Sequence, residues 1–230
     1  MGNLSEFLME ELNVATAFTI PIFGGIEVAE STVISWVIMA IIVILTLVLT
    51  RNMRVEKPGK LQVGVEYTVT ALQNLVRGII GHEGERYVPY LSTVLVFLGI
   101  SNIFAIFGMK PPTKDLNVTA ALALMSIILV QAASIRQNKV GGWLKGFTKP
   151  SKVITPLNVM ELAIRPLSLC MRLFGNVMGA FVVMKLLEHL VPVILPAVFS
   201  LYFDFFDGLL QAYVFVFLTG LYICLLYTSD

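Results

Sequence analysis

Five stretches of the chain are apolar over lengths that suit a crossing of the lipid bilayer. A helix needs about 20 mainly apolar residues to span the hydrocarbon core. By this measure the sequence predicts membrane helices at residues 31–50, 88–109, 116–135, 153–190 and 195–227. The fold class that follows is an all-α membrane protein with about five membrane-embedded helices. Neither a repeat nor a soluble domain is evident, and we interpret residues 1–230 as a single membrane domain.

Residues 60–81 have a different pattern, in which apolar residues recur every three to four positions, as on one face of a helix. The apolar positions are Val65, Val69, Leu72, Leu75, Val76 and Ile79. Polar residues stand opposite them, among them Glu66, Gln73 and Arg77. This spacing predicts an amphipathic helix that lies in the membrane interface with its polar face toward water.

The basic residues predict an orientation, because cytoplasmic loops carry an excess of lysine and arginine. Two connecting regions are basic, and they contain Arg51, Arg54, Lys57 and Lys60, and Arg136, Lys139, Lys145, Lys149 and Lys152. The hairpin between the second and third spans has only Lys110 and Lys114, partly balanced by Asp115. We therefore expect an extracytoplasmic N-terminal segment at residues 1–28 and a cytoplasmic C-terminus.

The composition agrees with a membrane protein and gives no sign of other partners. Hydrophobic residues make up 57% of the chain and charged residues 13%, against about a quarter charged in soluble domains. The net charge of +1 gives no reason to expect a nucleic-acid partner. Two cysteines and two histidines stand apart from one another, so we expect neither a metal site nor a cofactor.

The fourth span contains polar residues that a lipid-facing helix would exclude. Glu161, Arg165, Ser168, Arg172 and Asn176 follow one another at spacings of 4, 3, 4 and 4, which places them on one stripe of a helix. A charge near the centre of a bilayer costs about 2.5–3.5 kcal/mol on insertion scales. Arg172 lies deep in the span and stays protonated, so it can act only as a fixed positive charge.

The fifth span contains Asp204, Asp207 and Gln211. Asp204 and Gln211 are seven residues apart, which is two turns along one helix face. Carboxylates can bind and release protons or hold a cation. We expect this stripe and the Arg172 stripe to face each other, or a water-filled cavity, because ionisable residues in spans rarely face lipid.

Two other interpretations of these charges stay open at this point. A buried pairing of arginine and aspartate could be structural and hold two helices in register. A self-contained secondary transporter could use Arg172 and Asp204 to bind its substrate, although such transporters usually contain internal repeats.

Several segments, in the same order along the chain, resemble subunit a of the bacterial F-type ATP synthase. The segment SLCMRLFGN, from Ser168 to Asn176, is similar to the signature of that family. Four further segments agree with the family: FLGISNIFAIFG at 97–108, PPTKDLNVTAALAL at 111–124, PLNVMEL at 156–162 and LLQAYVFVFLTGLY at 209–222. The resemblance covers about residues 20–225.

The resemblance implies a role for each matching residue. Arg172 matches the essential arginine that faces the ring of c subunits, and Gln211 matches the glutamine opposite it on the last helix. Asn176 matches the polar residue one turn beyond the arginine, Glu161 a carboxylate near the cytoplasmic side, and Ser168 the serine of the signature. In the family fold the last two helices are long and tilt as a hairpin around the ring.

The function that the resemblance implies is translocation of protons or sodium through two half-channels, coupled to rotation of the c-ring during ATP synthesis or hydrolysis. Such a subunit has no nucleotide site of its own. Its implied partners are the c-ring, the b-type peripheral stalk and the rest of the complex, in a bacterial plasma membrane. The sequence does not fix which ion is carried, because selectivity resides mostly in the ring.

The chain departs from the family pattern at one position that matters. Many members have glutamate nine residues after the arginine, where this chain has Phe181. We infer that Asp204, with Asp207 beside it, supplies the titratable group of the outer half-channel instead. The tail from Cys224 does not resemble the usual end of the family, and we assign it no role.

Overall fold

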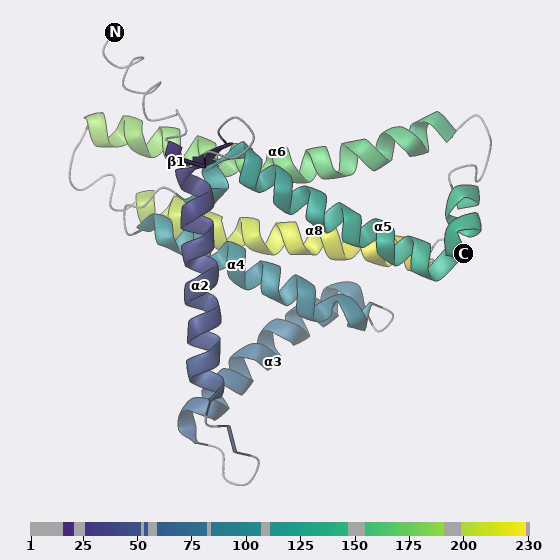
Figure 1. Ribbon diagram of the computed structural model, residues 1–230, viewed down its shortest axis with the longest axis horizontal. Helices are drawn as coiled ribbons and strands as arrows, with labels where there is room; N and C mark the ends of the chain where they lie inside the picture. The colour runs from purple at the N-terminus through teal and green to yellow at the C-terminus, as the bar shows by residue number, and fades with distance from the viewer. Residues whose placement is uncertain are drawn as a thin grey trace, which may run out of the picture. The chain divides into compact units, whose positions relative to one another are not determined.

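The computed structural model describes residues 16–20, 26–51, 53–54, 59–81, 84–106, 111–146, 155–190 and 199–228. Within these ranges five helical segments are long and apolar enough to cross a membrane. They are α2 (Glu30–Thr50), α4 (Val88–Ile106), α5 (Leu116–Gly146), α6 (Thr155–Leu190) and the segment formed by η4 (Leu201–Asp207) and α8 (Gly208–Thr228) (Figure 1). The predicted all-α membrane class is confirmed.

A small β-hairpin that the sequence analysis did not predict precedes the first membrane helix. Strands β1 (Thr16–Ile20) and β2 (Ile26–Ala29) pair antiparallel, with Thr16 opposite Ala29 and Ile20 opposite Ile26. Because β2 leads directly into α2, the hairpin lies at the start of that helix (Figure 1). The protein is therefore helical in its membrane segments and has a short β element before them.

Helix α3 (Lys60–Ile80) occupies the region with the amphipathic pattern. It ends at Gly81, whose positive φ of 72° is a conformation that glycine adopts at little steric cost. The N–H of Gly81 donates to the carbonyl oxygen of Arg77, which satisfies one acceptor of the last turn. Val76 and Ile80 are buried, whereas Leu61 and Tyr67 are exposed.

Helix α5 extends further than its apolar stretch, which ends near residue 135. Hydropathy locates the boundary of the hydrocarbon core, whereas a helix continues wherever its backbone bonds and propensities allow. Its first turn is capped by Asp115, whose Oδ1 accepts the N–H of Asn117 at 2.9 Å. A short 3-10 turn, η2 (Pro112–Lys114), leads into this cap.

The chain contains two compact units, and each includes parts of several helices. The first unit comprises residues 1–52, 96–118 and 174–212, and the second comprises residues 53–95, 119–173 and 213–230. One boundary falls between α2 and α3, and the other four fall inside α4, α5, α6 and the last membrane segment. Whether the chain functions as one membrane domain stays a prediction.

The two units bury different kinds of side chain. Fully buried apolar residues of the second unit include Val76, Leu91, Val130, Leu173, Val216 and Ile223. Among its described residues, the buried polar side chains are hydroxyl groups, namely those of Thr119, Ser126, Ser134 and Thr219. The first unit also buries amides and a carboxylate, namely Asn102, Asp115 and Gln211. Among the described residues, the buried amide and carboxylate side chains therefore belong to the first unit.

Candidate functional site

The polar stripe of α6 lies on an exposed face of the helix. Ser168 and Arg172 are exposed, Asn176 is half-buried, and the side chain of Glu161 is 57% exposed. Large apolar residues share this surface, and they are Leu157, Met160, Ile164, Leu167 and Met171. The opposite side of the helix is buried through Leu169, Cys170 and Leu173. The exposed face is thus mostly apolar, with polar groups at helical intervals.

Arg172 lies near the middle of α6, on this exposed apolar face. Among the described residues, no side chain forms an ion pair or hydrogen bond with it. Gly175 and Gly179 follow on the same face, and a Cβ atom at either position would meet nothing within 4 Å. Because glycine lets another helix approach closely, this part of α6 is suited to packing against an apolar partner.

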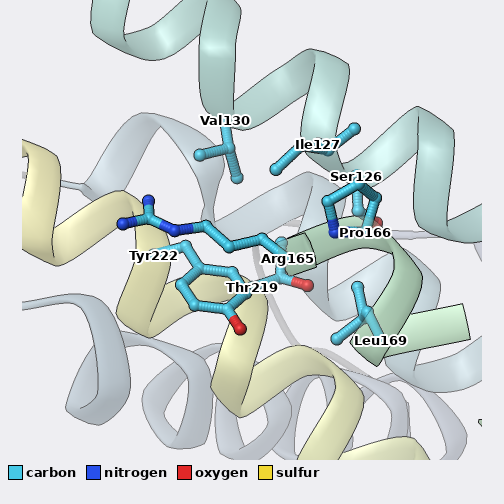
Figure 2. A pocket seen from close by; sticks show the side chains of 8 residues that line it. All are labelled: Ser126, Ile127, Val130, Arg165, Pro166, Leu169, Thr219 and Tyr222. Carbon is cyan, nitrogen blue, oxygen red and sulfur yellow. The ribbon is translucent and has the colours of Figure 1, made fainter. Parts of the chain in front are cut away.

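Arg165 and Glu161 lie two and three turns before Arg172 on α6, and they form an ion pair with an N–O distance of 3.0 Å. The guanidinium group of Arg165 also lies 5.2 Å from the centre of the Tyr222 ring of α8. Figure 2 shows this side chain extended toward Tyr222 in a narrow pocket that Pro166 and Val130 also line. Arg165 therefore has neighbours within the second unit, which compensate part of its charge.

The last membrane segment begins with a π-helix, which contains both predicted aspartates. Among residues 201–207 the backbone hydrogen bonds run from i+5 to i, and they return to α-helical spacing from Gly208. The side chain of Asp207 is half-buried and within hydrogen-bonding reach of Gln211. Asp204 is described only in its backbone. The two-turn spacing assumed for Asp204 and Gln211 does not apply across a π-helix, because the rotation per residue is different.

The predicted residues fall into both units. Glu161, Ser168 and Arg172 belong to the second unit. Asn176, Asp207 and Gln211 belong to the first. The expectation that the two polar stripes face each other therefore stays a prediction.

A buried polar group in α4 was not singled out by the sequence analysis. Asn102 is 2% exposed, and its Nδ2 donates a 2.7 Å hydrogen bond to the carbonyl oxygen of Gly208. Its Oδ1 accepts the hydroxyl of Thr113 at 3.2 Å. An isolated amide within the apolar run 97–108 is a sequence signal that could have drawn attention to it.

A second group of interacting residues surrounds Phe181. The ammonium groups of Lys114 and Lys185 both lie over its ring. The family resemblance implies a glutamate at this position. In this chain the two lysines instead contact the aromatic ring of Phe181.

Together, five helical segments long enough to cross a membrane, an arginine in the middle of one of them, and titratable and amide side chains in the last segment are typical of a polytopic ion-translocating membrane protein. The family model described as ATP synthase A chain matches residues 32–224, and the chain belongs to that family.

Individual relatives agree with this assignment. The chain is 37% identical to "ATP synthase subunit a" of Moorella thermoacetica, over 87% of its own length and 91% of the relative's. It is 34% identical to "ATP synthase subunit a 1" of Hahella chejuensis, over 87% and 85% of the two lengths. It is also 31% identical to "ATP synthase subunit a, sodium ion specific" of Propionigenium modestum, over 86% and 74%. The family supports an ion-translocating stator role in an F-type ATP synthase and a multi-pass membrane location.

Proposed function

We propose that the chain carries protons or sodium through two half-channels and couples their passage to rotation of a c-ring. The observation that carries this proposal is the exposed position of Arg172 in the middle of an apolar helix face. A cation there is tolerated when a partner with an acidic group covers the face, since an isolated charge in lipid costs about 2.5–3.5 kcal/mol. Gly175 and Gly179 leave room for a helix of that partner.

The proposed mechanism depends on the fixed charge of Arg172. A ring carboxyl group crosses lipid in its neutral form and favours its ionised form when it comes close to the guanidinium. It then releases its ion into one half-channel, moves past the arginine and takes up another ion from the second half-channel. Each ion that crosses supplies about 2.3 kcal/mol per 100 mV of membrane potential.

The other predicted residues have supporting roles in this proposal. Gln211 and Asn176 help to solvate or orient Arg172. Asp204 and Asp207 serve the outer half-channel, and Glu161 and Ser168 lie along the cytoplasmic route. The expected partners are the c-ring and the b-type peripheral stalk, in a bacterial plasma membrane with the N-terminus outside and the C-terminus in the cytoplasm.

The test uses the intact complex in proteoliposomes and measures ATP-driven ion pumping. Arg172→Lys keeps the positive charge but loses the planar fork of the guanidinium, and we expect it to abolish pumping while the complex still assembles. Val43→Ala, on the exposed surface of α2 and outside the α6 face, is the control and should pump normally. Coupled pumping by Arg172→Lys, or ion transport by the purified chain without its partners, would contradict the proposal.

The identity of the ion is tested with the same preparation. Pumping is measured with and without sodium, in the presence and absence of a protonophore. Pumping that needs sodium and survives the protonophore indicates a sodium carrier, whereas sodium-independent pumping that the protonophore abolishes indicates a proton carrier.

A further inference from the structure

Asn102 connects three segments of the first unit through one side chain. It belongs to α4, donates to the Gly208 carbonyl where η4 meets α8, and accepts from Thr113 in the turn η2. Asn102 and Thr113 are fully or almost fully buried, with exposed fractions of 2% and 0%. Both functional atoms of the amide are therefore used: one binds a residue 106 positions away and the other a residue 11 positions away.

The contact at Gly208 is close as well as hydrogen-bonded. A Cβ atom at this position would lie 2.7 Å from Cβ of Asn102 and 3.4 Å from its Nδ2. Any side chain larger than hydrogen would force the two backbones apart. The sequence thus combines the smallest residue on one helix with an amide on the other, which permits a direct bond from side chain to backbone.

Gly208 stands at the point where the hydrogen-bonding pattern of the last segment changes. Its N–H is shared between the carbonyl oxygen of Phe203, five residues back as in a π-helix, and that of Phe205. The α-helical spacing begins from Gly208 onward. The preceding residue is Asp207, and Gln211 follows one turn later. A peptide carbonyl has two lone pairs, so the Gly208 oxygen can accept the Asn102 amide without giving up its bond within the helix.

We propose that Asn102 is a positioning residue for ion transfer, because its amide fixes the Gly208 peptide and with it the turn that carries Asp207 and Gln211. This inference rests on the proposed function in one respect, namely that these two side chains take part in ion translocation. Thr113 has a secondary part, since its hydroxyl holds the amide of Asn102 in the orientation that points Nδ2 at Gly208.

The experiment compares variants in the intact complex, reconstituted in proteoliposomes. The measured quantities are the amount of assembled complex, the maximal pumping rate and the ion concentration that gives half-maximal pumping. Asn102→Leu removes the amide and keeps a similar volume. Ser101→Ala is the matched control, because Ser101 is buried beside Asn102 in α4 and its hydroxyl has no hydrogen-bond partner in the described part of the chain.

We expect Asn102→Leu to assemble and to shift the half-maximal ion concentration by about five-fold, the factor that corresponds to about 1 kcal/mol for a hydrogen bond between membrane helices. Ser101→Ala should leave this concentration unchanged. A purely structural role would lower the amount of assembled complex but would not change the half-maximal concentration of the complexes that remain, and that result would overturn the inference.

Two further variants distinguish a failure of assembly, a failure of the positioning role and a failure of the proposed function. If Asn102→Leu prevents assembly, Thr113→Val takes its place, and an unchanged half-maximal concentration in Thr113→Val overturns the inference. Asp207→Asn is measured in parallel. A shift in Asp207→Asn without one in Asn102→Leu overturns the positioning role alone, whereas no shift in either variant also overturns the assignment of Asp207 to the ion path.

Discussion

The ammonium nitrogen of Lys114 lies 3.5 Å from the centre of the Phe181 ring, and the ammonium nitrogen of Lys185 lies 5.8 Å from the same point. Both distances are within the range of about 6 Å over which a cation is attracted to an aromatic face. The ring of Phe181 therefore offers these cations a favourable contact at the position where the family resemblance implies a glutamate.

The first prediction concerns the substitution Phe181→Glu. A carboxylate at this position would meet Lys114 and Lys185, so we expect the complex to assemble and to keep coupled pumping. Phe181→Leu should instead lower the thermal stability of the complex, because each lost cation–π contact is worth about 0.5–2 kcal/mol. Thermal unfolding of the purified complex and ATP-driven pumping are the measurements.

The matched control for this pair is Phe205→Leu. Phe205 is 44% exposed and lies outside the ring contacts seen in the described residues, so its replacement should leave thermal stability almost unchanged. Poor assembly of Phe181→Glu, or equal stability of Phe181→Leu and the unchanged protein, would show that the two lysines do not stabilise this position.

The second prediction concerns Arg165 and Tyr222, whose guanidinium and ring lie 5.2 Å apart. Tyr222→Leu should destabilise the protein by about 0.5–1 kcal/mol, while Tyr222→Phe keeps the ring and should be neutral. In a double-mutant cycle, Arg165→Gln and Tyr222→Leu should together cost less than the sum of the two single changes. Strict additivity in thermal unfolding would speak against the contact.

The third prediction concerns the close approach of Gly220 to α3. A Cβ atom at Gly220 would lie 2.9 Å from Cγ2 of Ile79 and 3.2 Å from Cγ1 of Ile80, so Gly220→Ala should destabilise by about 1–3 kcal/mol. Gly78→Ala is the control, because no atom lies within 4 Å of a Cβ at that position. It should not destabilise the protein, since alanine is more favourable than glycine in a helix by about 1 kcal/mol. If both variants unfold at the same temperature, α3 and α8 are not packed this closely.

The fourth prediction concerns Asp115, which caps α5 and also accepts a hydrogen bond from the hydroxyl of Ser31 in α2. Asp115→Ala should cost about 1–2 kcal/mol, because the first turn of α5 and the start of α2 both lose an acceptor. Asp115→Asn retains an oxygen acceptor and should be milder. Limited proteolysis of the loop before α5 measures the effect, and equal cleavage rates in the two variants would refute the capping role.

The membrane helices could be predicted from sequence because their signal is strong and local. A run of about 20 mainly apolar residues leaves few alternatives, and α2 begins within a residue of the predicted start at Ser31. The β-hairpin at Thr16–Ala29 was missed because strands of five and four residues are shorter than the window that identifies a membrane span. A short segment with alternating apolar and polar residues is a much weaker sequence signal than a long apolar run.

The site was less accessible to sequence reasoning, because its contacts join distant segments. The hydrogen bond from Asn102 to Gly208 connects residues 106 positions apart, so no local pattern identifies the partner. The π-helix at Leu201–Asp207 has the same kinds of residue as an α-helix, and nothing in its composition reveals the wider turn. The stripe of α6, in contrast, follows directly from regular helical spacing.

The wide turn before Gly208 has a consequence for how this part of the protein could change during evolution. A hydrogen-bonded ring from i+5 to i contains one residue more than the ring of an α-helix. Deleting one residue between Leu201 and Asp207 could therefore be absorbed by tightening the turn, with α8 left undisturbed. The residues upstream of the deletion would keep their faces of the helix, because six α-helical residues turn through about the same angle as the seven residues of this π-helix. A single codon loss is therefore expected to be tolerated better here than in the regular helix that follows.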